Sequence, residues 1–550
     1  MPVRRSSSSS SASNAIAKPS VPVTPGQTLI IASNRGPVEF YHAADGRIAT
    51  RRGAGGVVTA LAAFARDVPL KWVATTMSAA DREVFSDAQA PARMVRLGRQ
   101  PLQVRYVPVP PDMYHRYYDE ISNEILWFLQ HYMWSPIQWP NFGEDQVRSW
   151  DEGYRPVNAA IARAIADEAL VDSAADHAGD DGANTIVLLQ DYQLYLVSAL
   201  VRARLPQATI QQFIHIPWPA NRYWQFLPDR FVHEIYEGLS GNDVLGFQTD
   251  SDMQNFLVGA QAFLTGSRVD FDRQTVVWRR HRLVARVYPI PTDAYELRRT
   301  LITASARASA DELGDLLSDE RQIIMRVDRL DPSKNVVRGF LAYETLLRRW
   351  PELRGRSCFL AFLIPSRQSI PIYRKYERDV RALIRRINTE YGTDGWQPIV
   401  PFFDNNRPRA LAAMRRYDVL LVNPIIDGMN LVAKEGPAVN ERHGVLVLSR
   451  TAGAFEQLAE VALPITPTDI DETATELYEA LRMSGRERTQ RAERARAIVE
   501  AETPVDWALA QLRDAVELRR ASTRRQPQRA ERARAAPVAY CGRRAMLARW

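Results

Sequence analysis

One turn in the second half of the chain places reactive side chains between a strand and a helix. Residues 417–422 form an apolar run of strand length, and residues 425–435 follow with the sequence IIDGMNLVAKE. Parallel α/β sheets form ligand crevices at the carboxyl ends of their strands, where the free N–H groups of the next helix attract anions or sugar hydroxyls. Asp427 and Glu435 add two carboxylates to this turn. The pattern alone fits a capped helix with solvated acids equally well.

The segment 427–435, DGMNLVAKE, resembles the signature of the trehalose-phosphate synthase family, a group of retaining glycosyltransferases that use sugar nucleotides. The resemblance implies an α/β fold of the GT-B architecture, in which two Rossmann-like domains face each other across a catalytic cleft. It also implies that Asp427 is catalytic and that Glu435 binds the ribose hydroxyls of the donor. The donor sugar would be held by Asp427 together with the backbone of Gly428, Met429, Asn430 and Leu431.

A second charged segment follows the predicted strand 323–327. Its sequence, DRLDPSKN, resembles the RLDY-x-KG motif of the family. The resemblance implies that Arg329 and Lys334 clamp the donor diphosphate as catalytic, donor-binding cations, without a metal or another cofactor. Pro332 replaces the tyrosine of the family and Asn335 replaces its glycine. Because asparagine tolerates a left-handed backbone better than most residues, we expect the turn to persist.

Two further motifs extend the donor site. The sequence GAGG at residues 53–56 precedes an apolar helical pattern and is a weak dinucleotide fingerprint by itself. It resembles a family turn in which Gly55 and Gly56 let backbone N–H groups approach the donor phosphates. His215, in the sequence HIPWP, resembles the histidine that the family places beside the donor sugar and the reacting centre. The resemblance therefore implies a catalytic role for His215.

The acceptor residues are implied in the same way. Arg35 follows the predicted strand 29–33 in the sequence SNRGPV, and Arg367 follows the predicted strand 359–364. The family has arginines at both positions on the acceptor phosphate, and a guanidinium fork matches phosphate oxygens in charge and geometry. The sequence YYDEISNEILW resembles the family's YY…SN..LW segment. The other acceptor-binding residues that the resemblance implies are Tyr118, Trp127 and Asp191.

The chain departs from the family around the acceptor. The family's HDYHL is QDYQL here, with Gln190 and Gln193 for two histidines, and Thr75 stands where the family continues with Gly-Trp. Glutamine keeps a hydrogen-bonding side chain but does not titrate, so we expect altered acceptor detail. The leading hypothesis is glucose transfer from UDP-glucose to glucose 6-phosphate. A glycerol phosphate or aminocyclitol phosphate acceptor, another nucleotide sugar, and a non-catalytic regulatory homologue stay open as alternatives.

The elements that must position these residues form two halves. A chain of 550 residues exceeds one ordinary core, and its apolar runs predict parallel sheets. We expect strands at 29–33, 71–74, 185–190, 211–214, 243–249, 323–327, 359–364, 417–422 and 445–449. We predict a disordered leader (1–26), an N-terminal acceptor-binding domain (27–290), a C-terminal nucleotide-sugar-binding domain with closing helices that return to the first domain (291–520), and a basic disordered tail (521–550).

Charge and composition bear on the expected partners. Residues 521–550 contribute +7 and residues 1–26 contribute +3 to a total charge of +7, so the basicity lies in the ends. We therefore expect no nucleic-acid surface, and the lack of a long apolar run predicts no membrane helix. Only two cysteines occur, which fits a reducing cytoplasm. The expected partners are a nucleotide sugar and a sugar phosphate, with homo-oligomerisation left open.

Overall fold

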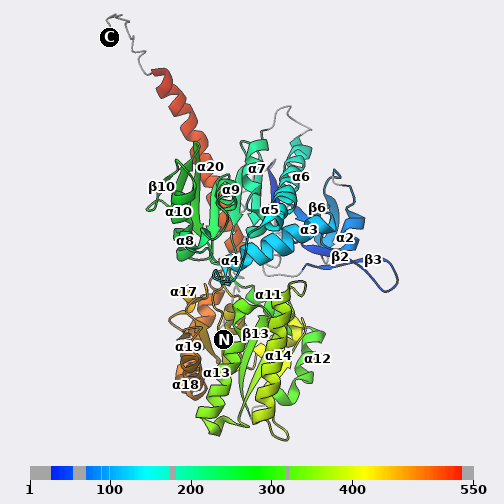
Figure 1. The fold of residues 1–550 in the computed structure, drawn as a ribbon, viewed down its shortest axis with the longest axis vertical. Helices are drawn as coiled ribbons and strands as arrows, with labels where there is room; N and C mark the ends of the chain where they lie inside the picture. Colours follow the sequence, from blue (N-terminus) through cyan, green and yellow to red (C-terminus); the bar gives the residue numbers. More distant parts are fainter. Residues whose placement is uncertain are drawn as a thin grey trace, which may run out of the picture.

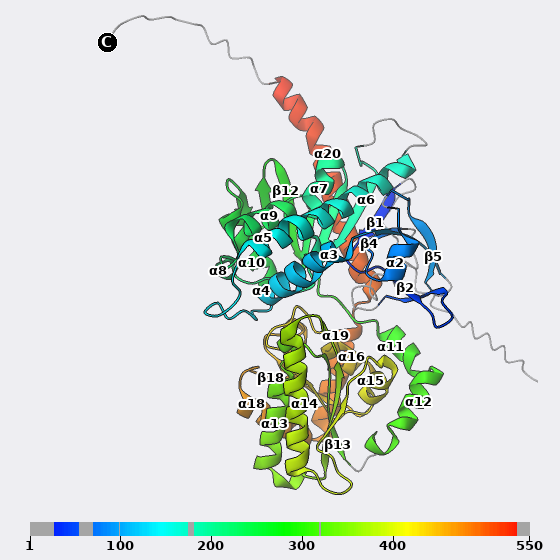
Figure 2. The same cartoon turned by 45° about the vertical axis from the view of Figure 1, so that its right-hand side comes forward.

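The computed structural model describes residues 27–53, 70–87, 89–97, 100–173, 181–317 and 321–535. Two α/β bodies lie one above the other along the long axis of the molecule (Figure 1). Each body is built on one large sheet with helices packed around it (Figure 2). The predicted leader and the pair Gly55 and Gly56 lie outside the described residues.

The upper sheet in Figure 1 has the strand order β10-β11-β12-β9-β8-β7-β1-β4-β6-β5. The strands from β12 to β6 run parallel, and antiparallel strands close both edges. Strands β1, β7 and β9 are mainly apolar because helices cover both faces of a parallel sheet, whereas β8 also buries Gln211 and Gln212. The strands are β1 (Thr28–Ala32), β4 (Lys71–Thr75), β5 (Arg93–Leu97), β6 (Gln100–Val107), β7 (Thr185–Gln190), β8 (Thr209–Phe213), β9 (Val244–Phe247), β10 (Arg268–Asp270), β11 (Thr275–Trp278) and β12 (His281–Val287), with a separate hairpin of β2 (Val38–His42) and β3 (Ile48–Arg52).

The lower sheet is parallel throughout and has the order β15-β14-β13-β16-β17-β18. This is the doubly wound order, which opens a crevice where the chain changes direction across the sheet. That switch point lies between β13 and β16, and its counterpart in the upper sheet lies between β1 and β7. The strands are β13 (Gln322–Arg329), β14 (Ser357–Ile364), β15 (Ile399–Phe402), β16 (Val419–Val422), β17 (Val445–Ser449) and β18 (Leu463–Ile465).

All nine predicted strands are present, and the α/β prediction is confirmed. A wide π-helical run, His115–Trp127, carries two of the predicted aromatic residues. No helix in the described ranges combines the length and the hydrophobicity needed to cross a bilayer. The helices are α2 (Ala79–Val84), α3 (Pro111–Tyr114), α4 (Phe128–Gln130), α5 (Glu144–Ser149), α6 (Arg155–Ser173), α7 (Val197–Arg204), α8 (Asn221–Trp224), α9 (Asp229–Leu239), α10 (Asp250–Phe263), α11 (Ala294–Leu301), α12 (Ala304–Glu312), α13 (Val336–Arg349), α14 (Pro371–Tyr391), α15 (Arg407–Met414), α16 (Val432–Val439), α17 (Phe455–Leu458), α18 (Ile470–Arg482), α19 (Gly485–Glu500) and α20 (Pro504–Ala535).

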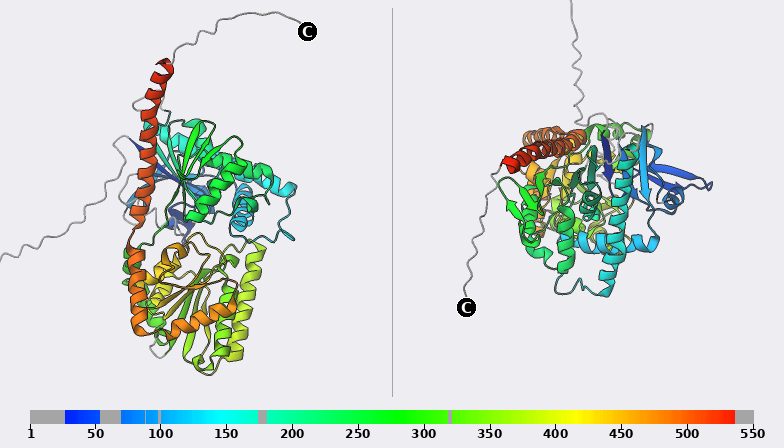
Figure 3. Two further views of the ribbon diagram at one scale, coloured as in Figure 1. Left: turned by 90° about the vertical axis from the view of Figure 1, so that its left-hand side faces the viewer. Right: turned by 90° about the horizontal axis from the view of Figure 1, so that it is seen from above.

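The last helix, α20, crosses from the lower body to the upper one (Figure 3). Trp507 Nε1 donates a hydrogen bond to the Tyr288 carbonyl at 3.0 Å, next to the end of β12. Gln211 Nε2, on β8, donates to Gln511 Oε1 at 2.7 Å, and Tyr288 OH donates to Asp514 at 2.6 Å. The expected return of the closing helices to the N-terminal half is therefore confirmed.

Residue 521 does not end this helix. Because α20 continues through Ala535, the first half of the tail that we expected to be disordered is helical. Apart from Pro527, residues 521–535 consist mainly of Ala, Arg, Gln and Glu, and the high helix propensity of these residues outweighs the low-complexity composition. The domain boundaries at 26, 290 and 520 remain predictions.

We predict that α20 stabilises the upper body through residues 504–519. Trp507→Ala should lower the first thermal unfolding midpoint by roughly 5–15 °C, because truncating a buried tryptophan costs about 3–5 kcal/mol. Deletion of 521–550 should leave that midpoint unchanged. Calorimetry on both variants tests the prediction, and a large loss on deletion would show that the tail also packs on the body.

Candidate active site

The predicted donor-phosphate loop leaves the lower sheet at its switch point. Arg329 is the last residue of β13, and Lys334 ends a single 3₁₀ turn. Asp331 caps that turn by accepting a backbone N–H bond at 3.1 Å. Asn335 follows with φ +57°, in the left-handed region, so the expectation that asparagine would take the place of the family's glycine is confirmed.

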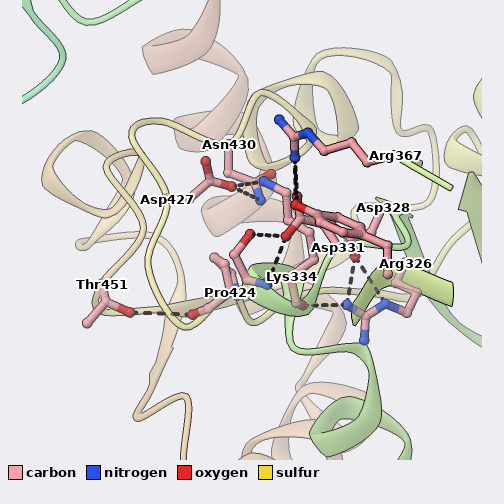
Figure 4. Close-up of polar contacts among 11 residues, drawn as sticks. Arg326, Asp328, Asp331, Lys334, Arg367, Pro424, Asp427, Asn430 and Thr451 are labelled. Carbon is pink, nitrogen blue, oxygen red and sulfur yellow. Dashed lines mark hydrogen bonds and ion pairs between the residues drawn. The ribbon is translucent and has the colours of Figure 1, made fainter. Parts of the chain in front are cut away.

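Asp427 lies across the switch point from this loop (Figure 4). The Lys334 ammonium contacts Asp427 Oδ2, and Asn430 Nδ2 donates to the same oxygen at 3.0 Å. The Ile425 N–H donates to the Ser333 carbonyl at 2.8 Å. These bonds join the loops after β13 and β16, which the strand order makes neighbours, into one unit.

A buried arginine fixes the path of the loop from within the sheet. Arg326 is fully buried in β13, pairs with Asp328 at 2.7 Å and donates to the Lys334 carbonyl at 3.0 Å (Figure 4). Burying a charge is costly unless it is paired and hydrogen-bonded, and both conditions are met here. Arg326 was not identified from the sequence, although a charged residue within the apolar strand IIMRV is a signal of a buried partner.

Asp331 joins the same loop to the predicted acceptor arginine. Arg367 Nη1 donates to Asp331 Oδ2 and to Tyr373 OH, each at 2.8 Å, and Tyr373 OH donates to Asp331 Oδ2 at 3.0 Å. Burial acts to raise the pKa of Asp331, but the Arg367 and Arg329 guanidinium groups lower it to about 2. The buried carboxyl is therefore ionised at neutral pH. Neither Asp331 nor Tyr373 was identified from the sequence, although Asp331 lies inside the RLD motif.

Trp127 covers these cations from the upper body. The centroid of its indole ring lies 4.0 Å from the Arg367 guanidinium and 5.2 Å from that of Arg329, which is the distance range of cation–π contacts. Tyr118, the other predicted aromatic residue, is half-buried and stacks on Tyr114 at 5.3 Å. Arg329, Arg367 and Trp127 are thus brought together from both bodies.

His215 and Asp191 lie near the switch point of the upper sheet. The His215 N–H donates to Asp191 Oδ1 at 3.2 Å, and His215 Nε2 lies 3.0 Å from Gln190 Oε1. Burial lowers the pKa of His215 to about 3, so the imidazole is neutral and its Nε2–H donates to the amide oxygen. Gln190, a departure from the family pattern, therefore keeps a hydrogen-bonding role.

Gly428 brings the two bodies into contact. A Cβ at this position would lie 2.2 Å from the His215 carbonyl oxygen, so only glycine allows the approach. Asp191 lies close by with φ +73°, a backbone conformation that few residues other than glycine adopt, and burial raises the pKa of its carboxyl to about 7. Strain and burial of this kind concentrate at functional sites.

The remaining predicted residues lie at the edges of this cluster. Glu435 is 3.4 Å from Arg407, and burial raises the pKa of the Glu435 carboxyl. Met429 is buried and Leu431 is half-buried just before α16. The half-buried Arg35 follows β1, and its guanidinium makes no hydrogen bond or ion pair with any described residue. Within the described ranges, no three His, Cys, Asp or Glu side chains are grouped so that they could hold a metal ion.

We predict that Asp191→Asn stabilises the folded protein at pH 8. Folding raises the pKa of this carboxyl from 3.8 to about 7, so the folded protein loses stability as the pH increases between these values. An amide does not titrate, so the variant does not have this loss. The melting temperature of the variant should exceed that of the wild type by several degrees at pH 8 and by much less at pH 4.5. Equal differences at the two pH values would contradict the raised pKa.

Several known proteins resemble this chain along most of its length. Residues 27–517 match glycosyltransferase family 20. A bifunctional trehalose-6-phosphate synthase/phosphatase from Thermoproteus tenax is 33% identical over 84% of this chain, and the match spans 60% of that relative. A validamine 7-phosphate valienyltransferase from Streptomyces hygroscopicus is 29% identical over 88% of this chain and 94% of its own length.

One solved structure has the same fold and a similar sequence. The α,α-trehalose-phosphate synthase (UDP-forming) from Burkholderia xenovorans, in complex with glucose-6-phosphate, has a TM-score of 0.73 and 28% identity, covering 89% of this chain and 99% of that one. The predicted GT-B architecture is therefore confirmed, and so is the family resemblance that the DGMNLVAKE and HIPWP motifs indicated. The chain belongs to glycosyltransferase family 20.

Proposed function

We propose that the protein transfers glucose from UDP-glucose to glucose 6-phosphate and releases UDP and α,α-trehalose 6-phosphate. The observation that carries this proposal is the cluster of three cations, Arg329, Lys334 and Arg367, at the lower switch point. Each substrate of this reaction is a phosphate ester, so a site for both must neutralise two separate sets of phosphate oxygens. The Burkholderia structure, which holds glucose-6-phosphate, supports the choice of acceptor.

On the donor side, Arg329 and Lys334 neutralise the charge that grows on the departing diphosphate. Fixed cations in a closed cleft stabilise such charge without reorganisation during the reaction. Lys334 contacts Asp427 in the structure, so a bound diphosphate competes for that ammonium. The Asp427 carboxylate then becomes available to the hydroxyls of the transferred sugar, beside the amide of Asn430.

Retention of the donor configuration restricts the mechanism. A double displacement requires a carboxylate nucleophile next to the anomeric carbon. We propose instead that the bond from C1 to the phosphate oxygen breaks while the bond from C1 to the acceptor oxygen forms on the same face. The departing phosphate takes the proton of the acceptor hydroxyl. His215 does not serve as the base, because burial lowers its pKa to about 3.

On the acceptor side, Arg367 and Arg35 bind the phosphate of glucose 6-phosphate. Arg367 is held in place by Asp331 and Tyr373, whereas Arg35 has no bond to another described residue and can turn toward a ligand. One arginine follows a strand of each body, so closure of the two bodies would complete the phosphate site and exclude water.

A second candidate acceptor is an aminocyclitol phosphate. The Streptomyces relative, named as a validamine 7-phosphate valienyltransferase, favours this candidate because the match covers nearly all of its length. Gln190 and Gln193, which depart from the synthase pattern, also leave it open. The phosphate-binding arginines would serve both acceptors, so the choice depends on the sugar-facing groups.

A nucleotide-release assay tests the proposed function. UDP-, ADP- and GDP-glucose are each combined with glucose 6-phosphate, glycerol phosphate, an aminocyclitol phosphate and free glucose. We expect the fastest release from UDP-glucose with glucose 6-phosphate, and a product identified as trehalose 6-phosphate. Faster release with the aminocyclitol phosphate would favour the second candidate, and no release with any pair would favour a regulatory homologue.

We also propose that the enzyme works in the cytoplasm, without nucleic acid or a membrane as partner. Cys358 is buried and free, and burial raises the pKa of its thiol to about 12, which suits a thiol that stays reduced. We further propose that the domain boundaries lie near residues 27, 290 and 520.

We predict that Lys334→Ala lowers kcat by at least about a hundredfold, because the diphosphate loses a fixed cation in the transition state. The fold should persist, and EDTA should leave the wild-type rate unchanged. Lys375→Ala is the matched control, since Lys375 pairs with Asp379 on an exposed helix face. Loss of wild-type activity in EDTA that magnesium restores would contradict the metal-free mechanism.

We predict that Arg35→Ala raises the apparent KM for glucose 6-phosphate by about tenfold to a hundredfold and leaves that for UDP-glucose unchanged. Arg35 is preferred to Arg367 for this test because Arg367 also holds Asp331. Free glucose, which lacks the phosphate, is the control acceptor. An equal rise for donor and acceptor would argue against the assignment.

A further inference from the structure

The imidazole ring of His131 stacks on the indole ring of Trp127. The imidazole and indole centroids are 3.9 Å apart, with 23° between the ring planes. His131 directly follows α4 and is fully buried, although Trp127 itself contacts Arg367 and Arg329 of the opposite body. The proposed function assigns no role to His131.

The hydrogen bonds of His131 define its tautomer. Nδ1 lies 2.8 Å from the Trp127 carbonyl oxygen, which can only accept, so Nδ1 carries the proton. Nε2 is therefore a hydrogen-bond acceptor. Its lone pair is buried and has no hydrogen-bond partner among the residues that the structure describes. Burial also lowers the pKa of His131 to about 4, so the ring is neutral at physiological pH.

The charges that act on His131 belong to the active site. Asp331 and Asp427 both act to raise its pKa, and Lys334 acts to lower it. The two carboxylates cannot donate to Nε2, and the Lys334 ammonium is already paired with Asp427. None of these three charged groups therefore donates a hydrogen bond to Nε2. A buried acceptor without a donor costs free energy.

A hydroxyl group has the chemistry of the missing donor. An ionised phosphate offers only acceptors, whereas each hexose hydroxyl both donates and accepts. Trp127 Nε1, on the ring that stacks against His131, is a buried donor that also lacks a partner among the described residues. The stacked pair thus offers one free acceptor and one free donor, which is the combination that sugar hydroxyls satisfy.

We propose that His131 is a substrate-binding residue whose Nε2 accepts a hydrogen bond from a hexose hydroxyl in the closed cleft. This proposal rests on the proposed glycosyl transfer. The hydroxyl belongs either to the transferred glucose, on the side of Asp427, or to the acceptor, on the side of Arg367. The chemistry is the same in both cases, and the experiment below separates them.

The first arm of the experiment is kinetic. His131→Phe keeps a ring that can stack on Trp127 but removes the acceptor, and His131→Gln keeps an acceptor near the position of Nε2. We expect His131→Phe to lower kcat/KM for one substrate by about tenfold to a hundredfold, and His131→Gln to recover part of that loss. One deoxy form of that substrate should be poorer than the parent sugar for the wild type and equal to it for His131→Phe.

His233→Phe is the matched control. His233 Nδ1 also lies 2.7 Å from the carbonyl oxygen four residues earlier, that of Asp229, but on an exposed helix face. Its kinetics should match those of the wild type. Wild-type kinetics for His131→Phe, or continued discrimination against every deoxy sugar that the wild type rejects, would overturn the proposal and leave a structural role.

The second arm uses the wild-type protein labelled with ¹⁵N at its eight histidines, which avoids any folding defect of a variant. The Nε2 resonance of His131 should move upfield when UDP-glucose or glucose 6-phosphate is added, and should not respond to UDP or inorganic phosphate. No response to either hexose-containing substrate, or the same response to the two ligands that lack a hexose, would overturn the proposal. If the resonance responds but no sugar is transferred, the proposed function fails and the binding role stands. If transfer occurs without a response, only the role of His131 fails.

Discussion

The buried carboxylate of Asp331 is the contact on which the rest of the site depends. It caps the turn that carries Lys334, and it accepts hydrogen bonds from both Arg367 and Tyr373. Removing one partner of such a buried pair leaves an uncompensated charge, which is far more costly than the net value of the pair. The positions of the donor-side and acceptor-side cations are therefore linked through one side chain that needs to touch neither substrate.

The two bodies contribute opposite kinds of chemistry to the cleft. The lower body supplies permanent charges, with arginines and a lysine compensated by Asp328, Asp331 and Asp427. The upper body supplies groups whose charged forms are disfavoured by burial, since the pKa of His215 falls to about 3 and that of Asp191 rises to about 7. Because the fixed cations of the lower body face a wall with little charge of its own, they favour negative charge on the departing group.

Features of the structure that depend on local sequence patterns could be predicted from the sequence. Each of the nine strands expected from apolar runs is present among the eighteen that the structure describes, and the turn chemistry of Asn335 predicted its left-handed backbone. Contacts between residues far apart in the chain could not be predicted. The contact of Arg367 with Asp331 depends on which strands are neighbours, and that of Trp127 with Arg367 depends on how the two sheets face each other. The basic, low-complexity composition predicted a disordered tail from residue 521, whereas residues 521–535 continue α20.

The path of α20 has a consequence for how the protein is made. The face of β8 and β9 that this helix covers belongs to the first half of the chain, yet residues 504–519 are synthesised near the end of translation. More than two hundred residues separate β12 from α20, and at about 5–20 residues per second the ribosome needs roughly 10–40 s to add them. During that time the nascent upper body exposes the face of β8 and β9 that α20 later covers. Folding of the upper body is therefore complete only after α20 has been synthesised.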